Sequence, residues 1–181
     1  MMSEFEKFLQ KSEEMRGGYI KSLEPPDKDF REKWLAVFSE IPAFFEEIFT
    51  VCDGTRRDIS EQIYFDFLPG VRLMRVDDII EAWERDFKGF DEYGVVIPFL
   101  EDYGGEYYAY ALAGERECVV SLMDGELEEI HYTVGDFWKT VIAFYDEGVY
   151  FPDEDGWLSY DEERESEVGS RLNEKISYWK E

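Results

Sequence analysis

The fold of this chain is decided by the stretch GVVIPFLEDYGGEYYAYAL, which covers residues 94–112. Residues 95–100 form a nearly unbroken apolar run, as is typical of a strand that is buried on both faces. Residues 102–105 are Asp-Tyr-Gly-Gly and predict a turn, because glycine adopts positive φ without steric cost. Residues 106–112 are rich in tyrosine, so we expect them to pair back as a second strand. Pro98 lacks a backbone N–H and is therefore expected at a bulge or where no ladder bond is needed.

A second hairpin is predicted by Asp124-Gly125, since a type I′ turn requires positive φ at both of its central residues. The segments 117–123 and 128–133 have the composition of its two strands. Two more strands are expected at residues 62–68 and 71–76, on either side of Pro69-Gly70. Hairpins along the chain predict a sheet that is mainly antiparallel.

Helices are predicted where an apolar stripe follows a capping signal. Ser3-Glu4-Phe5-Glu6 has the form of a capping box, and Gly17-Gly18 is expected to end this first helix. Four more are expected after Asp27 or Asp29, after Ile41-Pro42, from Asp77-Asp78 to Phe87, and from Thr133 or Gly135-Asp136 to Gly148. A last helix is predicted after a second capping box at Ser159–Glu162, with Val168, Leu172, Ile176 and Trp179 on one face. The pattern predicts one α+β domain over residues 1–181, a twisted, mainly antiparallel sheet with helices packed on one side.

The composition is strongly acidic, with 19 basic and 44 acidic residues and a net charge of −25. Such a surface repels nucleic acid and anionic lipid, and it attracts cationic partners. Solubility alone is the competing explanation for this charge. The aromatic content of 18% argues against a disordered chain, because aromatic side chains bury a large area each.

The sequence favours a cytoplasmic protein. The N-terminal residues lack the basic region and apolar core of a signal peptide, and no apolar run approaches the length of a membrane span. Cys52 and Cys118 stand far apart in apolar surroundings, so we expect reduced, buried thiols, with one disulfide as the alternative.

No set of residues predicts catalysis, a metal site or a cofactor. His131 is the only histidine, which disfavours a zinc site or a catalytic triad; an ordinary hydrogen bond in a strand is expected instead. Residues 153–156 hint at a calcium loop, but its first ligand position would fall on Phe151, which has no side-chain oxygen. Glu101, Asp102 and Glu106 flank one turn and could serve acid–base chemistry, although crowded carboxylates are more often a solvated turn.

Four pieces, in this order, resemble the SUKH superfamily of Smi/Knr-type domains. They are Ile41–Phe49 followed by Asp53-Gly54, Phe67–Met74 followed by Asp77–Phe87, Val96–Phe99 followed by Asp102–Tyr108, and Val119-Val120 followed by Phe137-Trp138. Together they cover about residues 35–150, so the first helix and the segment after Pro152 lie outside the resemblance. The order and spacing of the pieces carry it, since each motif alone is weak.

The resemblance implies a non-enzymatic immunity protein that neutralises a toxin, often a nuclease, by covering its active site. The acidity fits such a role, because a nuclease cleft is basic. The expected partner is the cognate toxin or another basic protein, bound by a monomer or homodimer; a regulatory or scaffolding interaction module is the alternative. The predicted contact residues are Glu101, Asp102, Tyr103, Glu106, Asp124 and Glu126. The competing explanation is that these residues are only solvated loop tips.

Overall fold

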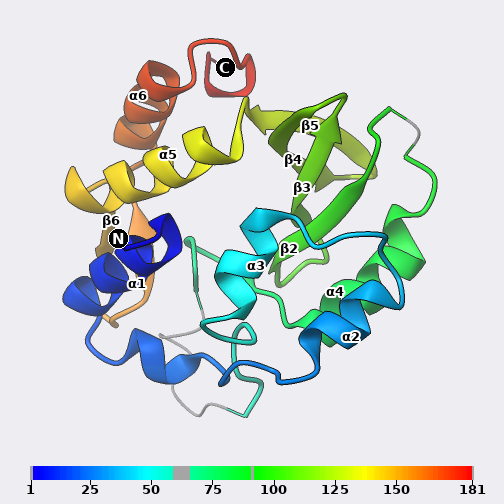
Figure 1. Cartoon of the computed structure of the whole chain (residues 1–181). Coiled ribbons are helices and arrows are strands. Elements are labelled where there is room, and N and C mark those ends of the chain that lie inside the picture. Colours follow the sequence, from blue (N-terminus) through cyan, green and yellow to red (C-terminus); the bar gives the residue numbers. More distant parts are fainter. Residues whose placement is uncertain (1, 59–65, 91, 181) are drawn as a thin grey trace.

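The computed structural model describes residues 2–58, 66–90 and 92–180, which form a single α+β domain (Figure 1). Its main sheet has five strands in the order β1-β2-β3-β4-β5, and every neighbouring pair is antiparallel. The strands are β1 (Val71–Leu73), β2 (Val96–Asp102), β3 (Tyr107–Ala113), β4 (Arg116–Met123) and β5 (Glu126–His131). The predicted fold class and both predicted hairpins are therefore confirmed.

The local chemistry of the two hairpins is as the sequence requires. The β2–β3 register shifts between Pro98 and Leu100, so Pro98 lies at a bulge as expected. In the β4–β5 turn, Asp124 and Gly125 have φ values of 51° and 81°, both positive, as a type I′ turn demands.

Helices cover the sheet and extend beyond it. They are α1 (Glu4–Met15), α2 (Phe30–Leu35), α3 (Ala43–Phe49), α4 (Val76–Ala82), α5 (Val134–Asp146) and α6 (Glu162–Leu172), with the short helical turns η1 (Tyr19–Ser22), η3 (Trp83–Phe87) and η4 (Tyr178–Lys180). A small second sheet joins β6 (Tyr150–Pro152) and β7 (Leu158–Tyr160). Figure 1 shows α5 lying between α1 and α6, and both of these helices contact it.

Aromatic rings fill the core between the sheet and the helices. The ring of Phe44 in α3 lies 4.9 Å from that of Phe99 in β2, which in turn lies 5.4 Å from Phe137 in α5. Tyr107 of β3 packs edge-on against Phe87 of η3, with ring centroids 5.3 Å apart. Such pairs add stability beyond the area they bury, which explains how a highly charged chain sustains one core.

Both cysteines are buried and free, as predicted. Burial raises the pKa of the Cys52 thiol to about 12 and that of Cys118 to about 11, which keeps both as neutral thiols.

The region before β2 departs from the sequence-based prediction. Of the strand expected at 62–68, residues 62–65 lie outside the described residues, and the rest is no strand but leads into a tight turn in which Leu68 bridges Val71. The next strand ends at Leu73 rather than Val76, because Val76 already begins α4. Asp77 and Asp78 do not cap this helix; the Val76 N–H donates instead to Oδ1 of Asp53, at 3.0 Å.

The C-terminal segment also differs from the prediction. The cap of α6 is Asp161, which accepts from the Arg164 N–H, so the capping box expected at Ser159 does not form because Ser159 belongs to β7. The helix ends at Leu172 rather than running to Trp179. Asn173 is the C-cap, where the backbone leaves the helical conformation with φ −126° and ψ 50°. Its backbone N–H and its side-chain amide both donate to the Gly169 carbonyl, each at 2.9 Å. The chain then folds back so that Trp179 packs on α6.

Candidate partner-binding face

Three turns meet at one end of the main sheet. Tyr107 pairs with Leu122 and Met123 pairs with Glu126, so the β2–β3 and β4–β5 turns lie at the same end. A shallow groove there is lined by Pro69, Gly70, Val71, Asp102, Glu106, Tyr107, Tyr108 and Met123. We call residues 69–70, 101–106 and 123–126 the turn face. All six residues predicted to contact a partner belong to it, so the structure brings them to one end of the sheet.

Tyr103 presents its ring to solvent in a fixed orientation. The residue is 61% exposed, yet its hydroxyl donates to Oδ1 of Asp66 at 2.6 Å. Asp66 is only 3% exposed, and its Oδ2 accepts from the Gly70 N–H at 2.8 Å. Burial raises the pKa of Asp66, and burial together with the bond to Asp66 raises the pKa of Tyr103. The hydrogen bond thus fixes the Tyr103 ring and the Asp66 carboxyl group relative to each other. An aromatic side chain that is already ordered before a partner binds loses little conformational entropy on binding.

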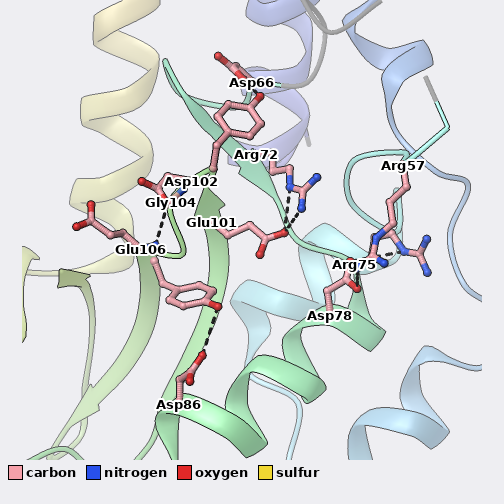
Figure 2. A network of polar contacts seen from close by, with 12 residues as sticks. Arg57, Asp66, Arg72, Arg75, Asp78, Asp86, Glu101, Asp102, Gly104 and Glu106 are labelled. Atoms are coloured by element: carbon pink, nitrogen blue, oxygen red, sulfur yellow. Dashed lines mark hydrogen bonds and ion pairs between the residues drawn. The ribbon is translucent and has the colours of Figure 1, made fainter. Parts of the chain in front are cut away.

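The sequence predicted that Glu101 contacts a partner, but in the structure its carboxylate is paired with Arg72. Nε and Nη2 of Arg72 donate to its Oε1 at 2.9 Å and 2.6 Å, across paired positions of β1 and β2 (Figure 2). The Glu101 side chain is only 17% exposed. Its charge is therefore largely neutralised, and its first role is to join β1 to the sheet.

Asp102 shapes the turn that carries Tyr103. Its Oδ1 accepts hydrogen bonds from the backbone N–H groups of Gly104 and Glu106, both at 2.8 Å (Figure 2). An aspartate carboxylate that accepts hydrogen bonds from nearby backbone N–H groups stabilises a turn in the way that backbone–backbone hydrogen bonds otherwise do. Asp102 therefore serves the geometry of the turn as well as its charge.

Glu106, Asp124 and Glu126 are the carboxylates of the turn face that remain available. Asp124 and Glu126 are exposed and Glu106 is partly so. Among the described residues, none of the three takes part in an ion pair. Glu128, exposed on β5 two residues beyond Glu126, adds to them and was missed from the sequence because it was taken only as a strand residue. Together these side chains place negative charge at the end of the sheet where Tyr103 lies.

The other candidates from the sequence have structural roles. His131 is buried, its Nδ1 lies 2.9 Å from Oδ1 of Asn173, and burial lowers its pKa to about 4. The ordinary hydrogen bond expected for this residue is thus confirmed. In the loop considered for calcium, Oδ1 of Asp153 accepts from the Asp155 and Trp157 N–H groups, both at 2.9 Å, and so forms the β6–β7 turn.

Neither the models of known protein families nor the curated proteins match the sequence of this chain. Across the described residues, no helix combines the length and the apolar character needed to cross a membrane.

Proposed function

We propose that this protein is a non-enzymatic binding protein of the immunity type, which neutralises a basic, nuclease-like toxin domain with its turn face. The observation that carries the proposal is that the exposed ring of Tyr103, whose hydroxyl is bound by Asp66, lies at the same end of the sheet as three carboxylates. These carboxylates belong to Glu106, Asp124 and Glu126, and none of them forms an ion pair with another described residue. An aromatic anchor surrounded by charge is a common composition of protein-binding hot spots.

Charge supports the same partner chemistry. The chain carries a net charge of −25. A nuclease domain binds the phosphates of its nucleic-acid substrate in a basic cleft, so its charge is opposite to that of this chain. Carboxylates on rigid turns can occupy such a cleft in place of phosphates, and long-range attraction accelerates the encounter. The resemblance of residues 35–150 to the SUKH superfamily points to the same role.

The test compares two triple variants with the same change in charge. Glu106, Asp124 and Glu126 are replaced by lysine in one; Glu32, Glu40 and Glu115, which are exposed and lie away from the turn face, are replaced by lysine in the other. Partners retained by the wild type from the native host are identified by mass spectrometry, and the best candidate is purified for binding and nuclease assays.

We expect a basic partner whose nuclease activity the wild type inhibits. The turn-face variant should bind at least about tenfold more weakly, and the control variant should lose much less. Binding should also weaken steeply as salt screens the attraction. A tight partner that both variants bind equally, or several weak partners with no inhibited activity, would contradict the proposal; the second result would favour a scaffolding module.

A further inference from the structure

A cavity of about 150 Å³ lies beside the turn face, between the sheet and the C-terminal segment. It shares Pro69, Val71 and Tyr108 with the groove of the turn face, so the two hollows adjoin. A cavity of about this size can hold a ligand as large as benzene. It is thus large enough for a short side chain or a small organic molecule.

One carboxylate lines this cavity, that of Glu165 on α6. Oε1 of Glu165 accepts a long hydrogen bond of 3.4 Å from the Tyr150 hydroxyl, and no lysine or arginine of the described residues forms an ion pair with it. Burial, with a smaller contribution from the nearby Glu162, raises the pKa of Glu165 to about 7. A partly buried carboxylate without a cation is less well solvated than an exposed one, so a cation that entered the cavity would be stabilised there.

The walls around this carboxylate are aromatic. They come from several elements: Tyr108 of β3, Tyr150 of β6, Tyr160 of β7, and Tyr178 and Trp179 of η4. The faces of such rings attract an ammonium group, most strongly when it is shielded from water. Among the described residues, the lining holds no lysine or arginine, and its one histidine, His131, has a pKa of about 4 and so stays neutral near pH 7. Carboxylate and rings therefore favour the same kind of ligand.

We propose that this cavity is a binding site for a primary alkylammonium group, with the nitrogen at Glu165 and the alkyl chain against the aromatic rings. An anion would be repelled by Glu165 and by the net charge of −25. A divalent metal ion would require several oxygen ligands, whereas the lining holds one carboxylate. The ammonium group can come from a lysine of a protein bound at the adjoining turn face or from a free amine. The inference goes beyond the proposed function and does not depend on it.

The test follows the indole N–H signal of Trp179 by heteronuclear NMR during titration with n-butylammonium. Titrations run to about 50 mM at constant ionic strength, because one ammonium group in one cavity is expected to bind in the millimolar range. n-Butanol and butyrate serve as neutral and anionic comparators. Glu165→Gln removes the charge at nearly constant shape, and Glu167→Gln, exposed on the same helix, is the matched control.

We expect a saturable shift with n-butylammonium alone, weakened at least about tenfold in Glu165→Gln and unchanged in Glu167→Gln. Affinity should fall about tenfold from about pH 8 to about pH 6, as Glu165 becomes protonated. No saturable shift, an equal response to n-butanol, or equal binding by Glu165→Gln would overturn the proposal.

A second titration distinguishes the two sources of the ligand. Nα-acetyl-lysine-N-methylamide carries the same ammonium chain between two peptide groups. Binding as tight as that of n-butylammonium would assign the site to a lysine of a bound protein, and binding of n-butylammonium alone would assign it to a free amine. Because these titrations use no partner protein, their failure would leave the proposed function standing, and failure of the partner assays would leave the cavity site standing.

Discussion

Gly169 in the middle of α6 lies directly under the indole of Trp179. A Cβ built on Gly169 would be only 2.1 Å from Cε3 of that ring. Glycine costs a helix about 1 kcal/mol relative to alanine, so its presence here needs a compensating gain. The gain is that the Trp179 indole packs on the backbone of α6 while its Nε1–H donates to the Ile130 carbonyl at 2.6 Å. The Trp179 indole thereby attaches η4 both to α6 and to β5.

We therefore expect Gly169→Ala to destabilise the protein by about 1–3 kcal/mol, even though alanine is the better helix former. The new methyl group would displace the Trp179 ring. Ser166→Ala, at an exposed position of the same helix, should leave stability within about 0.5 kcal/mol of the wild type. In a Trp179→Ala background the penalty of Gly169→Ala should vanish, which chemical denaturation of the four proteins can show; a penalty that persists there would place its cause elsewhere.

Tyr103→Phe should also destabilise, although Tyr103 is mostly exposed. The change leaves Oδ1 of the buried Asp66 without its donor, at a cost of about 1–3 kcal/mol. Tyr132→Phe is the matched control, since the Tyr132 hydroxyl has no hydrogen bond to the described residues. Denaturation midpoints measure both effects. Equal stability of the two variants would show that the Tyr103 ring is not held by Asp66.

Glu101→Lys and Glu106→Lys should behave differently, although both belong to the turn face. Glu101→Lys places a second cation beside Arg72 in a partly buried pair, and we expect a loss of about 1–3 kcal/mol. Glu106 forms no ion pair with the described residues, so Glu106→Lys should change stability by about 0.5 kcal/mol or less. Thermal unfolding of the two single variants measures the difference; a stable Glu101→Lys protein would mean that the pair with Arg72 contributes little.

The sequence predicted those parts of the fold whose cause is local. Asp124-Gly125 specifies its hairpin because both residues must have positive φ, whatever the rest of the chain does. The capping box at Ser3 formed for the same reason, since its two hydrogen bonds join residues three apart. The turn face was located because its turns have such local signals.

The contacts that give the turn face its properties join residues distant in sequence. Nothing near Tyr103 predicts that its hydroxyl reaches Asp66, and nothing near Glu101 predicts Arg72. The spacing of Val168, Leu172, Ile176 and Trp179 fits one long helix, but the same spacing is compatible with a helix that stops at Asn173 and folds back. The spacing of apolar residues indicates which side chains are buried, but it does not show whether they all belong to one helix.

His131 should remain neutral well below the usual range of a histidine. Its folded-state pKa is lowered by burial to about 4, so the stability gained from the neutral ring is complete above about pH 6.5 and is lost as the pH falls towards 4. As the only histidine of the chain, it gives a single set of ring signals in an NMR titration. A midpoint near 6.5 in the folded protein would contradict its burial against Asn173.

Glu165 should produce the opposite pH dependence, which Glu165→Gln can isolate. Burial raises its folded-state pKa to about 7, above the ordinary value of 4.5, so the protonated form is favoured in the folded state. Its contribution to stability is complete below about pH 4.5 and is lost as the pH rises through 7.

Glutamine keeps the neutral shape at every pH. The stability of Glu165→Gln relative to the wild type should therefore increase from about pH 5 to about pH 8, by up to about 2–3 kcal/mol. Glu167→Gln should show no such trend, because its carboxylate is exposed. Urea denaturation of the three proteins across this range measures the effect without any ligand. A difference between Glu165→Gln and the wild type that stays constant with pH would mean that the Glu165 carboxylate is ionised in the folded protein throughout, and that its charge is already balanced by water or by a neighbour.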